Sequence, residues 1–189
     1  MSNKVSEATD TIELGAENKR VALLIAALAL ALALTEVAGD DAKTEAQMRN
    51  VESANLWAFF QARTIRQTVL SAEADRGAVD AAQLGDPAAR GALEQQIQRW
   101  RATVARWESE PETREGRREL ATRAREAEEA RDRAMRADGR YDAASALLQV
   151  GIVLASAGII VGMAAFAWVA AALGVAGAAM SAATFFGLL

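Results

Sequence analysis

The sequence predicts an all-α membrane protein with three transmembrane helices and a long, coiled-coil-like helical region outside the membrane. Three observations predict this class. Two stretches lack charged residues, 21–34 and 146–189, and they suit one span and a hairpin of two spans. The charged middle repeats hydrophobic residues at alternating steps of three and four. Alanine, leucine, arginine and glutamate are frequent and the 189 residues include only 2 prolines, so no β-sheet is expected.

The composition excludes several classes of function. The chain contains no cysteine and no histidine, which removes thiol nucleophiles, Cys/His zinc sites and histidine-based catalytic triads. The segment 21–145 carries 18 basic and 21 acidic residues, a near balance without the basic patch that nucleic acids require. We find no acid–base constellation and no phosphate-binding glycine loop. The expectation is a protein with no catalytic activity, no cofactor, no metal and no nucleic-acid partner.

The first apolar stretch is expected to be a transmembrane helix. Fourteen apolar residues run from Val21 to Leu34, and Val37 and Ala38 extend the stretch to 21–38, about 27 Å of helix. Two alternatives remain open. A cleaved signal peptide is disfavoured by the long acidic segment before the stretch. A buried core helix stays possible because the run is short.

The second apolar stretch, Ala146 to Leu189, is expected to be a hairpin of two spans. As one helix its 44 residues would measure about 66 Å, twice what a bilayer needs. The turn is expected within Gly162–Trp168, where Phe166 and Trp168 suit a membrane interface. Glycine and alanine recur at four-residue spacing in both spans, which favours close packing within the hairpin, with subunit contact as the alternative.

The charges that flank the first span predict an orientation. Lys19 and Arg20 precede it and Asp40 and Asp41 follow it, which places the N-terminus in the cytoplasm. Arginine also far outnumbers lysine, as in bacteria with GC-rich genomes, so the expected location is the bacterial inner membrane, with the inverse orientation as the alternative. The predicted parts are an N-terminal cytoplasmic segment 1–20, a transmembrane helix 21–38, a helical stalk 39–145 in the periplasm and a transmembrane hairpin 146–189.

Three stretches of the stalk carry a 3-4 hydrophobic repeat, the pattern of a coiled-coil seam. The first seam consists of Met48, Val51, Asn55, Ala58, Ala62, Ile65, Val69 and Ala72; the second of Leu93, Ile97, Trp100, Val104 and Trp107; the third of Ala127, Ala130, Ala134, Ala137, Tyr141, Ala144 and Leu148. Three helices are expected, at about 41–76, from Pro87 with Asp86 as N-cap to Ser109, and from about 116 onward into the hairpin. Seams made of such small residues bury little apolar surface area within one chain. A homo-oligomer is therefore expected, because contacts between subunits would bury more.

The segment Asn55–Gln67 raises a question about partners. Its apolar and aromatic side chains surround the whole helix, so one packing partner cannot cover them. We expect the first seam to pack on the third helix, which leaves Trp57 and Phe60 on the opposite side. Another subunit, or the second helix through Trp100 and Trp107, is the favoured cover. The membrane surface and a small-molecule pocket are the alternatives.

Nine residues are candidates for interaction or for a polar role in the membrane. The interaction candidates are Trp57, Phe59, Phe60, Arg63, Arg66, Trp100 and Trp107, and the intramembrane polar candidates are Glu36 and Gln149. Arg63 and Arg66 are expected to pair with acidic residues of the third helix, with an anion or a lipid headgroup as the alternative. Those acidic residues are Glu126, Glu128, Glu129 and Asp132. Glu36 lies near the end of its span and is expected at headgroup level, within reach of Gln149.

The segments NVESANLWAFFQARTIRQT (50–68), NKRVALLIAALALALALTE (18–36) and ESEPETREGRREL (108–120) resemble a bacterial integral membrane protein family catalogued as domain of unknown function 4337. The resemblance covers nearly the whole chain. It implies an N-terminal span, a charged helical middle and a C-terminal membrane hairpin, and it implies no activity. It also implies an aromatic residue and often a histidine just before Tyr141, where this chain has Gly139 and Arg140.

These observations favour a structural role in the membrane. The expected function is a homo-oligomeric scaffold or adaptor whose partners are membrane lipid and copies of itself, with another membrane protein as a further candidate partner. The alternative is a pore-forming or transport-accessory subunit whose oligomer encloses a path for a small solute or ion. A pore requires a span with one polar face that lines the water-filled path. The few serines and threonines of the hairpin do not form such a polar stripe.

Overall fold

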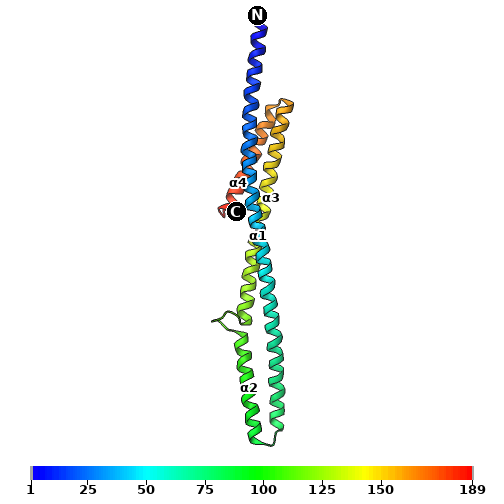
Figure 1. Cartoon of the computed structure of the whole chain (residues 1–189), viewed down its shortest axis with the longest axis vertical. Coiled ribbons are helices and arrows are strands. Elements are labelled where there is room, and N and C mark those ends of the chain that lie inside the picture. Colours follow the sequence, from blue (N-terminus) through cyan, green and yellow to red (C-terminus); the bar gives the residue numbers. More distant parts are fainter. Residues whose placement is uncertain (1, 189) are drawn as a thin grey trace. The chain divides into compact units, whose positions relative to one another are not determined.

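The computed structural model describes residues 2–188, with side chains described from Asn18 onward. In this part the chain forms four α-helices and no strand (Figure 1). The helices are α1 (Ser2–Gln83), α2 (Pro87–Glu108), α3 (Arg117–Val161) and α4 (Ala164–Phe185). The all-α class is therefore confirmed. The predicted segment 1–20 falls, up to residue 17, outside the described side chains, as does Leu189 at the end of the predicted hairpin.

Helix α1 extends beyond both ends of the predicted helix 41–76, and the glycines that flank that range, Gly39 and Gly77, lie inside it. Gly39 packs against Tyr141, and a Cβ atom on Gly39 would lie 3.2 Å from the Tyr141 Cβ. Gly77 packs against Ile97, with a corresponding distance of 3.3 Å to its Cγ1 atom. Both glycines permit a neighbouring helix to approach closely, which explains their presence within a helix despite their low propensity.

The ends of α2 and the start of α3 follow local sequence signals. Asp86 caps α2, accepting a hydrogen bond from the backbone N–H of Ala88 at 3.0 Å, and Pro87 occupies the first helical position. Both assignments were predicted. The loop before α3 is held by the Glu119 carboxylate, which accepts from the Ser109 hydroxyl at 2.7 Å and from the Glu110 N–H at 3.2 Å.

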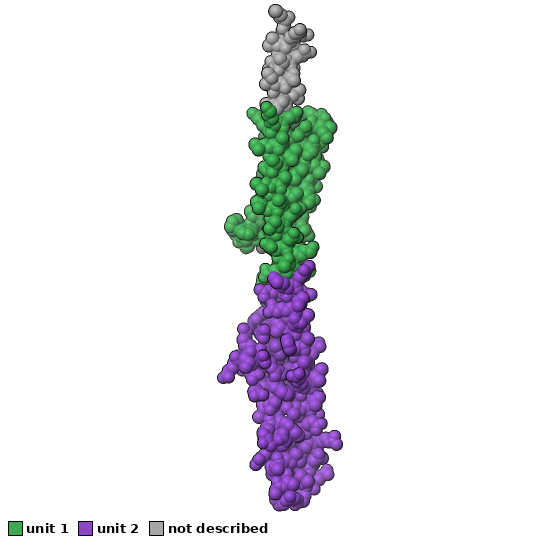
Figure 2. Space-filling model, in the orientation of Figure 1, with its two compact units in different colours: residues 1–45, 133–189 green, residues 46–132 purple. Residues whose placement is uncertain are grey.

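The helices divide into two compact units, residues 1–45 with 133–189 and residues 46–132 (Figure 2). The first unit contains the N-terminal part of α1, the C-terminal part of α3 and α4. The second contains the rest of α1, all of α2 and the start of α3. Three helices include stretches long and apolar enough to cross a membrane, within Asn18–Gln83, Arg117–Val161 and Ala164–Phe185.

Small residues bring the helices of the first unit together. Gly151 of α3 faces the Ala170 carbonyl of α4, and Gly177 of α4 faces the Ala144 carbonyl of α3. Gly174 of α4 accommodates Leu28 of α1, which is 6% exposed. These contacts support the interpretation that the glycine and alanine pattern serves packing within the hairpin.

The turn of the hairpin lies at Gly162 and Met163, at the start of the predicted segment. Gly162 has a φ of 69°, a left-handed conformation that ends helices and that residues with a side chain rarely adopt. Helix α4 begins directly after it, at Ala164.

The second and third predicted repeats mark the buried faces of α2 and α3, whereas the first repeat does not mark the buried face of α1. Every predicted position of the α2 and α3 seams is buried or half-buried. All eight predicted seam positions of α1 are exposed instead, from Met48 through Ala72. The face of α1 that packs on α2 and α3 lies on the other side of the helix. Its positions are Arg49, Ser53, Leu56, Phe60, Arg63, Gln67, Leu70, Ala74, Gly77 and Ala81, again in steps of three and four, and we call it the inner face.

Candidate functional site

The inner face of α1 meets the end of α2 and the start of α3 in a cluster of charged and aromatic residues. We call this cluster the arginine–aromatic junction and define it by Phe60, Arg63, Trp107, Glu108 and Arg117. Phe60 and Arg63 are three residues apart and therefore share one side of α1. The other three residues flank the loop between α2 and α3. The junction thus contains five side chains of the second unit, which come from α1, α2 and α3.

An apolar cluster adjoins the junction. Leu56 of α1 and Leu120, Ala124 and Ala127 of α3 are all buried, and Trp57 and Phe60 pack against them. The Trp57 and Phe60 rings meet edge to face, with centroids 5.4 Å apart and planes at 84°. The expectation that Trp57 and Phe60 lie opposite the third helix was therefore wrong, because the helix turns its Leu56 side, not its first seam, toward α3.

The indole of Trp57 is fixed by a charged acceptor. Its Nε1 donates a hydrogen bond of 2.8 Å to Oε1 of Glu128 on α3. A half-buried indole requires such a partner, because an unpaired N–H would lose the bond that water provides. Glu128 was expected to pair with an arginine of α1 and bonds the tryptophan instead.

Glu108 is the electrostatic centre of the junction. Its carboxylate accepts from Arg117 Nε at 2.8 Å and Nη2 at 3.1 Å, from Arg118 Nε at 3.0 Å and from Gln67 at 3.2 Å. The bond from Arg117 is bidentate, the strongest geometry for this pair. These donors stabilise the charged form, first Arg117, then Arg118 and Gln67, and they lower the pKa of Glu108 to about 2. The same contact raises the pKa of Arg117.

Two arginines of the junction stack on aromatic rings. The guanidinium carbon of Arg63 lies 5.9 Å from the Trp107 ring centroid, and that of Arg117 lies 5.7 Å from the Phe60 centroid. Arg63 also forms an ion pair of 3.5 Å with Glu115. Its acidic partner therefore comes from the loop between α2 and α3, not from the α3 residues that the sequence suggested, because Arg63 lies level with that loop.

A cavity of about 540 Å³ adjoins the junction. Its lining consists of Leu56, Phe59, Ala62, Arg63, Arg66, Glu115, Leu120 and Arg123. Three guanidinium groups face one carboxylate, so the lining favours an anionic group next to an apolar wall. In the described part of the chain Arg66 forms no ion pair, and the expected pairing with α3 is not observed for it. Among the same residues no cluster of three acidic side chains is placed to hold a metal ion.

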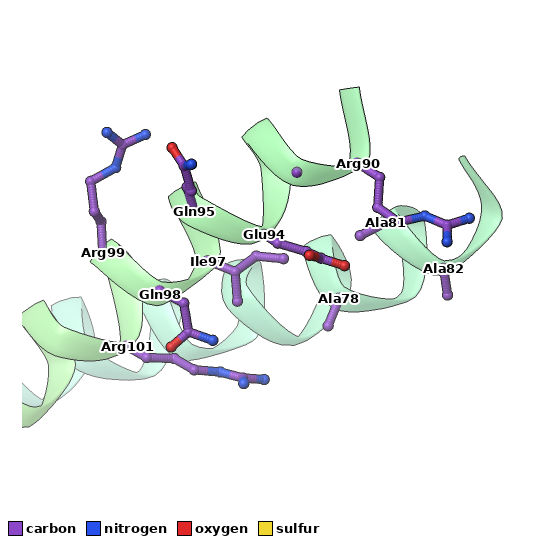
Figure 3. Close-up of a pocket in the computed structure, with 11 residues that line it drawn as sticks. Ala78, Ala81, Ala82, Arg90, Glu94, Gln95, Ile97, Gln98, Arg99 and Arg101 are labelled. Carbon is purple, nitrogen blue, oxygen red and sulfur yellow. The ribbon is translucent and has the colours of Figure 1, made fainter. Parts of the chain in front are cut away.

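The remaining predicted residues lie apart from the junction. Phe59 is 64% exposed. Trp100 belongs to a second apolar cluster, with Leu93, Ala74, Ala81 and Ile97. A groove of about 890 Å³ runs beside that cluster between α1 and α2, and in Figure 3 Ile97 lies between the helices while Gln95 and Arg99 point away from α1. Its walls consist mainly of alanine and of exposed polar side chains that do not converge on one point, as the polar groups of a ligand site do.

The two intramembrane candidates do meet, in the first unit. Gln149 Nε2 lies 3.5 Å from Glu36 Oε1, at the long limit of a hydrogen bond. Both side chains are exposed. They line a cavity of about 400 Å³ together with Lys43, Asp138 and Tyr141, among other residues. A polar contact that sequence reasoning missed lies nearby: Thr35, 2% exposed, donates its hydroxyl to the Ala31 carbonyl at 2.9 Å, and its oxygen lies within hydrogen-bond distance of the Ser181 hydroxyl at 3.0 Å.

Sequence reasoning also missed the Glu108 network. Glu108 and Arg117 are separated by a loop containing Pro111 and Gly116, so helical spacing does not relate them. The only available signal was the density of opposite charges around that loop.

One of three comparisons with known proteins gave a match, and that match covers most of the chain. Searches of curated proteins and of solved structures gave no significant match. One family model, described as domain of unknown function (DUF4337), matches residues 17–187. The match covers both units, including the junction, the three apolar helices and the hairpin turn. The chain therefore belongs to the DUF4337 family, as its sequence motifs had indicated.

Proposed function

We propose that the protein is a non-catalytic scaffold or adaptor of the bacterial inner membrane that works as a homo-oligomer. Three spans would anchor it, at 21–38 and in the hairpin 146–189, and residues 39–145 would form a periplasmic stalk of coiled-coil character. The observation that carries the proposal is continuity. Helices α1 and α3 each pass from an apolar stretch into a charged stretch without a break.

Such continuity suits a mechanical role. Both helices contribute residues to each unit without an intervening loop. The junction supports the same role, because its bidentate ion pair joins α2 to α3 and its two stacked arginines join α1 to both. The neighbouring bond from Trp57 to Glu128 adds a second link between α1 and α3. None of these groups is arranged as a nucleophile with a base, the arrangement that covalent catalysis requires.

A pore or transport-accessory role is supported less well. A conducting path needs polar side chains that face a lumen, and the polar side chains of the candidate spans bond to their own bundle. Thr35 bonds to Ser181, and both Ser156 and Thr184 donate to the carbonyl four residues earlier.

Native mass spectrometry of the complex, extracted from its own membrane in a mild detergent, tests the proposal. The expected mass is a whole multiple of the 20.0 kDa chain plus bound lipid, with or without one further protein. Carbonate washing of the membranes provides the control, since an anchored protein stays in the pellet. A 20.0 kDa monomer without partners, or a protein released by the wash, would contradict the proposal.

A further inference from the structure

The exposed seam of α1 is the most unusual surface of the second unit. It consists of Met48, Val51, Asn55, Ala58, Ala62, Ile65, Val69 and Ala72, and we call it the outer seam. It keeps alternating steps of three and four over 25 residues, about three and a half heptads. Met48, Val51, Ile65 and Val69 are each between 58% and 64% exposed. A contiguous apolar stripe of this length on a soluble surface marks a contact site.

The outer seam and the inner face occupy opposite sides of one helix. Outer residues such as Ala58 and Ile65 lie roughly 180° around the axis from inner residues such as Leu56 and Phe60, at 100° per residue. The inner face is already covered by α2 and α3. The surface left without a cover in the segment Asn55–Gln67 is thus the outer seam, and Trp57 and Phe60 are already packed.

We propose that the outer seam binds the outer seam of a second copy of this chain, in parallel and in register, as a two-stranded coiled coil. The parallel direction rests on the proposed membrane function, because two copies anchored in one membrane by the same spans extend their α1 helices in the same direction.

Asn55 identifies the partner as a second copy. It occupies an a position, and it is the one polar residue in an otherwise apolar seam. An amide both donates and accepts hydrogen bonds, so it pairs with an identical amide opposite itself. A single asparagine at an a position favours a parallel, in-register dimer for this reason. Within the described chain Asn55 has no hydrogen-bond partner of its own.

The charges beside the outer seam are compatible with this pairing. In a parallel dimer each g position faces the e position five residues later in the partner. The four facing pairs from residue 47 to residue 73 are Gln47 with Glu52, Ala54 with Phe59, Gln61 with Arg66, and Thr68 with Glu73. None of them places like charges together. Phe59 lies beside the small residues Ala58 and Ala62, where close approach of two helices would cover its ring.

Disulfide trapping tests the proposal directly, because the chain has no natural cysteine. Full-length single variants Ala58→Cys, Ala62→Cys and Val69→Cys are oxidised in native membranes. In a parallel, in-register dimer identical residues at seam positions lie opposite one another, close enough for a disulfide. The expected result is a disulfide-linked dimer for all three variants, about tenfold more abundant than for the matched control Ala102→Cys on the exposed side of α2. Equal yields at seam and control positions would overturn the proposal.

A second variant tests whether the disulfides report a stable dimer or only rare collisions between copies of the chain. Ile65→Asp places a charge in the seam and leaves the inner face intact, so the helices should persist by circular dichroism while the mass of the complex falls by half or more. An unchanged mass with Ile65→Asp would also overturn the proposal. The membrane wash separates this inference from the proposed function: cross-linked protein that the wash releases supports the dimer and contradicts the membrane role, whereas anchored protein without cross-links does the reverse.

Discussion

At the scale of single residues, Glu108 has the most strongly perturbed environment in the described chain. Three donors bind one carboxylate that is 23% exposed, so the charged form is favoured by direct bonds and not by burial. The Trp57 indole shows the same principle with a neutral donor, since its bond to Glu128 satisfies an N–H that packing has removed from water. In both cases a carboxylate on one helix holds a neighbouring helix in place by accepting hydrogen bonds from it.

The perturbed pKa predicts how stability depends on pH. Because the folded pKa of Glu108 is about 2, below its usual 4.5, its contribution is complete above pH 4.5 and is lost as the pH falls toward 2. Glu108→Gln should therefore cost about 1 kcal/mol or more at pH 7, and progressively less below pH 4.5. Thermal unfolding in a mild detergent from pH 7 to pH 3 measures this. Glu112→Gln, at an exposed loop position, serves as control, and a constant difference between wild type and Glu108→Gln across the range would contradict the prediction.

At the scale of helices, hydrophobic periodicity identified the buried face of α2 and of α3 and failed on α1. The reason is that α1 carries two stripes with the same 3-4 spacing. The outer seam is the more apolar of the two stripes, whereas the inner face includes Arg63, Gln67 and Gly77. Arg63 and Gln67 tolerate partial burial because of partners elsewhere in the chain, Trp107 and Glu115 for Arg63 and Glu108 for Gln67. Gly77 lies on this face because its lack of a side chain lets Ile97 approach closely. The hydrophobic periodicity of the sequence gives no information about those partners. The more apolar outer seam was therefore predicted, wrongly, to be the face that packs on α3.

The candidate site was predictable to a similar extent. The aromatic and arginine residues were recognised, because their density on a helix is unusual. Their partners were not, since Glu108 and Glu115 depend on how the α2–α3 loop folds back against α1. Capping signals were more reliable because they act within four residues, as Asp86 and Pro87 show.

Packing of the hairpin provides a prediction at the helix scale. A Cβ atom on Gly177 would lie 2.9 Å from the Ala144 carbonyl oxygen, and a backbone atom cannot move aside cheaply. Gly177→Val should push α3 and α4 apart and destabilise the hairpin by about 1–3 kcal/mol. Ala178→Val, the adjacent exposed position of the same helix, is the matched control and should have little effect. Unfolding of both variants in the same detergent measures the difference, and equal losses would show that the close approach is unimportant.

At the scale of the whole molecule, charge and apolarity are separated along the chain. The segment 146–189 has no charged residue, and 21–38 has only Glu36, whereas the remainder is densely charged. Each unit is held by a matching means: small residues and backbone proximity in the first, ion pairs and aromatic contacts in the second. This division is the one expected of a membrane protein, because charged side chains are costly in lipid, whereas contacts between small residues pack helices together there.

The orientation of the chain follows from the same separation and can be measured with single cysteines. Lys19 and Arg20 on one side of the first span, against Asp40 and Asp41 on the other, predict a cytoplasmic N-terminus, and one crossing would then expose the α2–α3 loop to the periplasm. Glu112→Cys, in that loop, should react with a membrane-impermeant maleimide in intact cells, whereas Ser6→Cys should react only after lysis. The long segment between the first span and the hairpin weakens the charge rule, so the reverse labelling pattern is the informative alternative. That pattern would place the stalk and any dimer of outer seams in the cytoplasm, and the partners of the scaffold would then be cytoplasmic proteins.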